Sequence, residues 1–328
     1  MFANAASGSA VCATKAPSSA HARAAPFPRA APASHPFTGC RSPAGPHGTF
    51  QAQARPQSLH VVRSAKGITY TSYEGNSFKI NFKKAGVTLL IDPWLVGDLT
   101  FGGLGEWFYA GKKVDALPPF EESSQCDAIV LTQGLDDHAH KPTLERLDKE
   151  IPVIASPTGA EVARSLGFRS VTPLPHGASA SILDGRIKIT ATQGALVGPP
   201  WSTRENGFVM EEMVDGGARV YYEPHCDYAG DLAATVGKVD VVVSPVRTVS
   251  LGSYPLVKGL EYMPLVKALK PQVLVGMNNA ETTQVGLLSQ GIKTEGTLEQ
   301  VPGALQAEGI ETKFVTVKTG QPEEIALQ

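Results

Sequence analysis

The order of strand-like and helix-like segments along residues 67–328 constrains the fold more than any other feature of the sequence. Hairpin-like strands and strand–helix units both occur in the first half of this region, and the second half mixes them in much the same way. Hairpins make antiparallel pairs, whereas parallel neighbours need a long crossover, so each half must contain both kinds of pairing. We therefore predict an α+β fold of four layers, αββα, in which two mixed β-sheets pack together with helices on both outer faces.

The predicted strands are short apolar or alternating runs bounded by turn residues. They are Ile68–Tyr73, Ser77–Phe82, Val87–Ile91, Ala128–Thr132, Val153–Ser156, Val171–Leu174, Ser179–Leu183, Arg186–Thr192, Gly207–Glu212, Arg219–Tyr222, Val239–Ser244, Gln272–Gly276 and Thr312–Val317. The predicted helices are Lys141–Lys149, Thr158–Leu166, Leu260–Leu269, Glu281–Ser289 and Leu298–Ala307. Asp184-Gly185 is the strongest hairpin signal, and the long segment 96–119 is a candidate lid or pocket wall.

The N-terminal segment differs from the rest of the chain in charge. The first acidic residue is Glu74, whereas six basic residues occur from Lys15 to Arg63. An acid-free leader rich in Ala, Ser and Pro, without a continuous apolar stretch, is typical of an organelle transit peptide. Because Pro and Ser are too dense for the amphipathic helix of mitochondrial leaders, we expect residues 1–66 to direct the chain to the chloroplast, to the stroma rather than a membrane. A disordered basic arm is the alternative.

Charge and hydropathy exclude several classes of partner. After residue 66 the chain has more acidic than basic side chains. This argues against nucleic acid, because phosphate neutralisation needs clustered Lys and Arg. No apolar run reaches the roughly 18–20 residues of a membrane-spanning helix, so no transmembrane segment is expected. A small-molecule ligand or substrate is the expected partner, and the sequence indicates no particular protein partner.

The densest polar cluster directly follows the predicted strand Ala128–Thr132 and reads Gln133-Gly134-Leu135-Asp136-Asp137-His138-Ala139-His140. A loop at the end of a buried strand can present carboxylate and imidazole groups to a pocket. Asp137 and His138 can point at one ion only from a loop, because neighbours on a regular strand face opposite ways. The alternative is an ordinary polar turn that caps the helix predicted at Lys141.

Three segments of the chain resemble one known family. They are Leu89-Leu90-Ile91-Asp92-Pro93-Trp94, the Asp137-His138 pair, and Tyr221-Tyr222-Glu223-Pro224-His225. Together they resemble the metallo-β-lactamase fold superfamily, and within it the lactonase-like and ribonuclease-Z-like metal-dependent hydrolases. The resemblance runs from about Gly67 to Val317. It implies a metallo-β-lactamase-like domain over residues 67–328 with the four-layer sandwich inferred above, and a metal-dependent hydrolase activity.

The metal motif of that family, His-x-His-x-Asp-His, is incomplete in this chain. Gln133 and Leu135 stand at the two leading histidine positions, while Asp137 and His138 match the last two. Leucine has no donor atom, and neutral amide oxygens bind zinc poorly beside imidazole or carboxylate.

The later family ligands also differ. The next family histidine falls on Gln193, the bridging aspartate falls on His225, and the final histidine falls on Asn278 or Asn279. The resemblance therefore implies that the three histidines of one metal site are missing and that at most one metal ion binds.

Asp137, His138 and His225 remain as candidate ligands of that ion, and we expect their side chains to converge. Two nitrogens and one oxygen with an open position match a mononuclear zinc site, and iron is also possible. Asp136 or His140 is the candidate for moving a proton, for a fourth metal ligand, or for the partner that fixes the tautomer of an imidazole ligand. The alternatives are a surface position for His140 at a helix start, and a structural hydrogen bond for His225.

The candidate substrate-binding residues are Gln133, Gln193, Trp201, Arg204, Asn278 and Asn279. A rigid Pro-Pro segment that holds Trp201 near Arg204 suits an anionic or planar ligand. A hairpin connection with an exposed tryptophan explains the same residues equally well.

Two functions from different classes follow. The first is a plastid hydrolase that uses at most one metal ion to cleave an ester, lactone or phosphodiester of a small metabolite. The second is a non-catalytic family member that binds a metabolite, lipid or protein in the vestigial site, because core packing and site chemistry are largely separate. The role of Cys226, next to His225, stays open.

Overall fold

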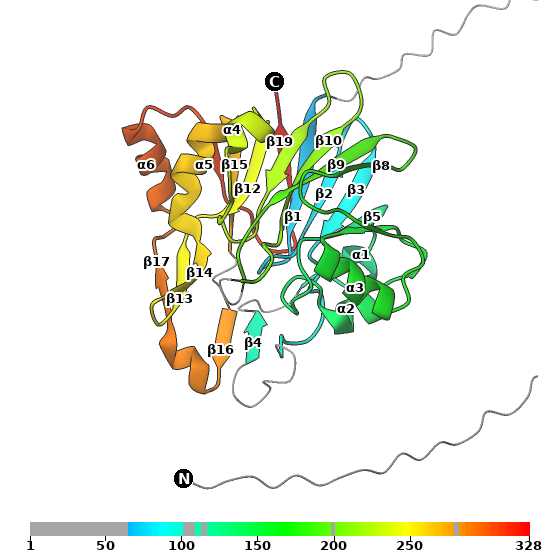
Figure 1. Cartoon of the computed structure of the whole chain (residues 1–328). Coiled ribbons are helices and arrows are strands. Elements are labelled where there is room, and N and C mark those ends of the chain that lie inside the picture. Colours follow the sequence, from blue (N-terminus) through cyan, green and yellow to red (C-terminus); the bar gives the residue numbers. More distant parts are fainter. Residues whose placement is uncertain (1–64, 101–108, 113–116, 198–200, 279–281) are drawn as a thin grey trace, which may run out of the picture. The chain divides into compact units, whose positions relative to one another are not determined.

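Two mixed β-sheets lie at the centre of the fold (Figure 1). They are seen in a computed structural model that describes residues 65–100, 109–112, 117–197, 201–278 and 282–328. Within these residues each central sheet has seven strands. Both sheets combine antiparallel hairpins with parallel pairs, as the order of segments in the sequence predicts.

The first sheet starts as an antiparallel meander and continues with parallel strands. In spatial order its strands are β19 (Pro322–Ala326), β1 (Gly67–Ser72), β2 (Phe78–Phe82), β3 (Val87–Ile91), β5 (Ala128–Leu131), β6 (Val153–Ala155) and β7 (Val171–Pro173). The late strand β19 pairs antiparallel with β1, so residues from both ends of the described region share one sheet.

The second sheet repeats this plan, with a meander followed by parallel strands. In spatial order its strands are β18 (Lys313–Val315), β15 (Val273–Met277), β12 (Val241–Pro245), β11 (Arg219–Tyr222), β10 (Asn206–Glu212), β9 (Ile187–Gln193) and β8 (Ser179–Ile182). The β8–β9 turn confirms the predicted hairpin, because Asp184 and Gly185 have positive φ angles of 58° and 76°.

Helices cover the outer face of each sheet (Figure 1). On the first sheet they are α1 (Phe120–Ser123), α2 (Lys141–Arg146) and α3 (Pro157–Ser165), and on the second α4 (Leu232–Thr235), α5 (Tyr262–Leu269) and α6 (Gln300–Ala307). Leu144 and Ala160 pack with Ile129 on the first face, and Leu265 packs with Val242 on the second. The four-layer sandwich is therefore confirmed. None of the described helices is long and apolar enough to cross a membrane.

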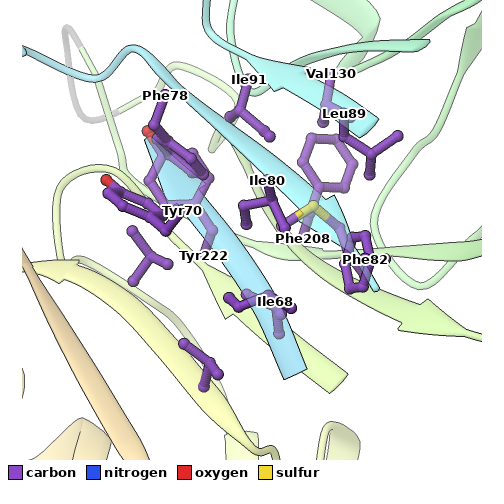
Figure 2. Packing of buried hydrophobic residues seen from close by; sticks show 14 of the residues in the cluster. Ile68, Tyr70, Phe78, Ile80, Phe82, Leu89, Ile91, Val130, Phe208 and Tyr222 are labelled. Carbon is purple, nitrogen blue, oxygen red and sulfur yellow. The ribbon is translucent and has the colours of Figure 1, made fainter. Parts of the chain in front are cut away.

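The two sheets pack face to face through buried apolar side chains (Figure 2). Phe78 of β2 and Tyr222 of β11 make an edge-to-face aromatic pair across the interface, with ring centroids 4.8 Å apart. Ile80 and Phe208 are fully buried in the same cluster. Because Tyr222 packs its ring in this core while its hydroxyl reaches polar groups at the sheet ends, packing of the sheets also positions the candidate site.

Two smaller sheets were not predicted from the sequence. One contains β14 (Tyr254–Lys258), β13 (Thr248–Leu251) and β17 (Ile292–Glu295), and the other pairs β16 (Thr282–Val285) with β4 (Tyr109–Lys112). The helix predicted over Glu281–Ser289 is therefore wrong. Thr282, Thr283 and Val285 are β-branched and pair with β4, and Gly286, with φ 107°, ends the strand. Short 3₁₀ helices follow β14 and β16 (Gly259–Glu261 and Leu287–Gly291).

Truncation of a core side chain tests the packing of the two sheets. Ile80→Ala should lower the free energy of unfolding by about 2–5 kcal/mol, because the cavity left between the sheets cannot collapse fully. Met213→Ala is the control, since Met213 exposes 52% of its surface whereas Ile80 exposes none. Urea denaturation should show a change within about 0.5 kcal/mol for the control. Equal effects of the two substitutions would contradict this packing.

Candidate functional site

Two loops, one from each central sheet, bring a carboxylate and two imidazoles together. Asp137 and His138 lie in the loop after β5, and His225 lies just after β11. One ligand atom from each of the three residues lies within 4.8 Å of the other two. The rings of His138 and His225 meet edge to face, with centroids 5.3 Å apart. The structure thus brings together the three side chains that the sequence predicts to converge.

Asp92, directly after β3, fixes the orientation of His138. Its buried carboxylate accepts hydrogen bonds from the backbone N–H and the hydroxyl of Thr132 (2.8 and 2.6 Å) and from Nδ1–H of His138 (2.9 Å). Nε2 of His138 is left facing Asp137, 3.3 Å away. Metal-ligating histidines commonly donate their other N–H to a carboxylate in this way. The Asp92 contact therefore selects the tautomer that a metal ligand needs.

Two residues that were not predicted to belong to the site complete the polar contacts. Asn76, in the turn between β1 and β2, donates Nδ2–H to Asp137 Oδ2 (3.2 Å) and lies 3.1 Å from His138 Nε2. The Tyr222 hydroxyl donates to Asp92 Oδ2 (3.1 Å). The Asn76 amide can donate to Nε2 of His138 only when that imidazole ring is neutral. The amide and a proton therefore compete for the lone pair of Nε2. No local motif marks Asn76, and Tyr222 lies in a segment that resembles the family but had no predicted role, because the partners of both residues lie far away in the sequence.

The charges of the cluster are strongly coupled. Burial disfavours the charged form of His138, but the carboxylates of Asp137 and Asp92 outweigh it and raise its pKa to about 10. Burial, together with the charge on His138, lowers the pKa of His225 to about 4. Burial also opposes ionisation of Asp137, yet His138 and His225 hold the pKa of that carboxyl below its usual value. The cluster therefore contains an ionised carboxylate, a charged imidazole and a neutral imidazole at neutral pH.

Glu223 holds the loop that carries His225. Its buried carboxylate accepts hydrogen bonds from the backbone N–H groups of His225 (3.1 Å), Asp227 (2.7 Å) and Ala195 (3.1 Å). Burial raises the pKa of Glu223 to about 7 although these bonds favour the ionised form. Burial also raises the pKa of the adjacent Cys226 thiol, so this thiol is neutral and poorly suited to act as a nucleophile.

Asp136 and His140, the candidates for proton transfer, lie outside the group of three converging side chains. His140 is buried at the start of α2, so the alternative of a surface position is wrong. Its Nδ1 contacts the Thr143 hydroxyl (2.9 Å) and its Nε2 contacts the Asp98 carbonyl oxygen (3.4 Å). Burial lowers the pKa of His140.

Of the candidate substrate-binding residues, Gln133 lies against the cluster, with Nε2 3.4 Å from Nδ1 of His225. Arg204 forms an ion pair with Asp227 (2.7 Å). The side chain of Trp201 is 85% exposed, as expected for the hairpin-connection alternative.

The remaining candidates lie at strand ends. Gln193 is exposed at the end of β9. Asn278 follows β15, and its buried Oδ1 has no hydrogen-bond partner among the described residues. Asn279 lies outside the described residues.

A cavity of about 350 Å³ lies beside the cluster. Asn76, Asp137 and His225 contribute to its wall, together with Leu135 and with residues of the two small sheets. Asp136 and His140 are not among the lining residues. The candidate substrate-binding residues that the structure describes are not among them either. The volume is in the range of small-molecule sites, so the cluster borders a space that a small ligand can fill.

The family profile of the beta-lactamase superfamily domain matches residues 69–278, which is more than half of the chain. The chain belongs to the metallo-β-lactamase superfamily. None of the curated proteins matches the sequence significantly.

Solved structures share the metallo-β-lactamase fold of this chain. Isothiocyanate hydrolase from Delia radicum gut bacteria is 19% identical, with a TM-score of 0.57 over 79% of this chain and 100% of that one. A possible metal-dependent hydrolase from Veillonella parvula is 17% identical (TM-score 0.56; 80% and 100% covered). Igni18, a metallo hydrolase from Ignicoccus hospitalis, is 15% identical (TM-score 0.56; 80% and 100% covered). At these identities the likeness shows the fold.

The donors of this metallo-β-lactamase cluster fit one metal ion. Oδ1 of Asp137 and Oε1 of Gln133 are buried and have no hydrogen-bond partner among the described residues. An uncompensated carboxylate oxygen beside two imidazoles is costly, and a cation would satisfy it. One carboxylate and two imidazoles, one of them oriented by Asp92, make a suitable ligand set for zinc or iron.

The charge coupling predicts an unusual histidine titration in the metal-free protein. NMR titration of labelled histidines should give a pKa of about 10 for His138 and about 4 for His225. Because the folded-state pKa of His138 exceeds its unfolded value, its contribution to stability is fully present below about pH 6.5. That contribution is lost as pH rises through about 10.

Asp92→Asn tests the cause of this titration. The substitution should lower the pKa of His138 by roughly 1–3, because an uncharged amide replaces one of the two carboxylates. Asp215→Asn, in the exposed β10–β11 turn, is the matched control and should leave the pKa unchanged. An ordinary pKa for His138 in the unsubstituted protein would contradict the proposed coupling.

Proposed function

We propose that this metallo-β-lactamase superfamily member is a hydrolase that uses one zinc or iron ion to cleave an ester, lactone or phosphodiester bond of a small metabolite. Asp137, His138 and His225 hold the ion in this proposal. The observation that carries it is the convergence of these three side chains beside a cavity, with His138 oriented by the buried carboxylate of Asp92. Three proteins of similar fold are described as hydrolases, which supports this class of reaction.

The protein's own groups have distinct tasks in this proposal. When bound, such an ion polarises a carbonyl oxygen and lowers the pKa of a water molecule to about 7. Asp92 and Thr132 hold the His138 ring, and Glu223 holds the loop of His225. Asn76 borders both the cluster and the cavity, and its amide N–H donates to Asp137 Oδ2 and so helps to hold that carboxylate in place.

Ester hydrolysis also requires a proton for the leaving group. The oxygen of water bonds to the carbonyl carbon, the bond between that carbon and the alcohol oxygen breaks, and the departing alkoxide takes up a proton. Asp136 or His140 carries that proton in the proposal based on the sequence. Both ring nitrogens of His140 contact other groups, the Thr143 hydroxyl and the Asp98 carbonyl oxygen.

The second candidate function is binding without catalysis in the same cavity. It is favoured by Gln133 and Leu135, which stand where the resemblance predicts histidine, and by Asn76, whose amide competes for the lone pair of His138. Metal content separates the two candidates, because a protein that only binds a metabolite has no need of the ion.

Metal analysis of the purified full-length chain tests the hydrolase. Elemental analysis after expression in zinc- and iron-supplemented medium should give close to one ion per chain. Asp137→Ala and His225→Ala should each weaken metal binding by at least ~100-fold, because each removes one of three ligands. Hydrolysis of p-nitrophenyl esters should fall in parallel.

His176→Ala is the control for metal binding, because the His176 ring contacts the Glu205 carbonyl oxygen and lies outside the cluster. Metal content should stay unchanged in this variant, and circular dichroism should show that all variants are folded. A metal-free protein, or unchanged metal content in both Asp137→Ala and His225→Ala, would rule out the proposed site.

We also propose that the protein works in the chloroplast stroma. This rests on the composition of residues 1–66, because the structure describes the chain only from residue 65 onwards. A fluorescent protein fused to residues 1–66 should accumulate in plastids of a transformed plant or algal cell, whereas the unfused fluorescent protein should stay in the cytosol. Accumulation of the fusion in the cytosol or in mitochondria would contradict the proposal.

A further inference from the structure

We propose that the cavity beside the cluster holds an uncharged, apolar acyl or alkyl chain, so that the substrate is a neutral ester or lactone rather than a phosphodiester. This inference rests on the proposed hydrolase for the reaction, but the nature of the ligand follows from the cavity itself. The reaction is ester hydrolysis, in which water supplies the oxygen of the acid product and the proton of the alcohol product.

The wall of the cavity is mainly apolar. The three-stranded sheet β14–β13–β17 contributes several aliphatic side chains and Tyr254, and the loop after β3 contributes Trp94 and Leu99. The aliphatic lining residues of the small sheet include Val249, Leu251, Leu256, Val257 and Ile292. Trp94, Leu99 and Ala110 also form a buried apolar cluster of their own. Contact with such a wall favours methylene and methyl groups over charged ones.

Lysine and arginine side chains are absent from the described lining of this cavity. Its ionisable groups, apart from Tyr254, are Asp137 and His225, both at the candidate metal cluster. Arg204 and Lys258 are not lining residues, and both contact a carboxylate instead, at 2.7 and 3.1 Å from Oδ1 of Asp227. Phosphate and carboxylate groups are normally recognised by Arg, Lys or several N–H donors. An anionic tail would lose its hydration in this cavity without receiving a charged partner.

Exposed apolar side chains line the same cavity. Leu135, Tyr254 and Leu256 expose 44%, 46% and 40% of their surfaces, and all three are lining residues. Leu135 lies two positions before Asp137, so the apolar wall reaches the metal ligands. A chain placed in the cavity would cover these side chains and bring its ester group next to Asn76 and Asp137. Polar groups on one part of the wall and apolar groups on the rest would thus orient the substrate.

Direct binding tests the ligand class without requiring catalysis. Isothermal titration of the full-length protein with N-hexyl-, N-octyl- and N-decylacetamide measures neutral chains with no scissile ester. Affinity should rise about fourfold for each added methylene until the cavity is filled. Affinity that does not depend on chain length would overturn the proposal.

Two leucines in the same region provide a matched pair of variants. Leu256 and Leu260 expose similar fractions, 40% and 47%, but only Leu256 lines the cavity. Leu256→Arg should weaken binding of N-octylacetamide at least ~10-fold and should improve binding of a chain that ends in a carboxylate, because the cavity gains a cation. Leu260→Arg should change neither affinity by more than about twofold. Equal losses in the two variants would overturn the proposal.

Two results distinguish an incorrect ligand class from an incorrect hydrolase assignment. If the protein holds no metal but still binds longer acetamides more tightly, the ligand class stands and the hydrolase fails. If metal binds and p-nitrophenyl hexanoate is cleaved no faster than bis-p-nitrophenyl phosphate, the hydrolase stands and the neutral apolar substrate fails. We expect the hexanoate ester to be cleaved at least ~10-fold faster than the phosphodiester.

Discussion

The buried carboxylate of Asp92 connects the two halves of the molecule. It follows β3 of the first sheet, orients the loop after β5 through Thr132 and His138, and accepts a hydrogen bond from Tyr222 of the second sheet. A buried carboxylate is costly unless several donors compensate it, and here those donors come from two separate segments, the loop after β5 and strand β11. The orientation of His138 therefore depends on correct packing of both sheets, and core and site are coupled.

The loop after β11, which carries His225, is also held in place by a buried carboxylate. Glu223 is a second buried carboxylate, and it binds backbone N–H groups of the segment that carries His225. Each candidate imidazole is thus supported by a carboxylate that does not itself face the cavity. Supporting groups of this kind hold ligands in position before any ion or substrate arrives, which reduces the cost of ordering the site on binding. Because the polar cluster lies at one part of the cavity and the rest of the wall is apolar, a ligand with one polar and one apolar end would bind in a single orientation.

The sequence predicted most of the architecture because local patterns encode it. Apolar runs such as Val241–Pro245 are buried on both faces, and the Asp184-Gly185 turn fixes a hairpin, so the central strands could be placed from the sequence. The helix predicted over Glu281–Ser289 was wrong because pairing of β16 with β4 overrides local periodicity. The strands of the small sheets were also missed, and with them much of the wall of the cavity.

The sequence by itself determined the layered fold, the acidic residue and two histidines available for a metal, and the loss of the other family ligands. Only the tertiary structure decided that these three side chains meet, that Asn76 joins them, and that Asp92 and Tyr222, 130 residues apart, support them. It also decided that the adjoining cavity is apolar and has no lysine or arginine in its described lining. The reason is physical: periodicity and turn chemistry act over a few residues, whereas a binding site is made of contacts between distant segments that exist only after the sheets have packed.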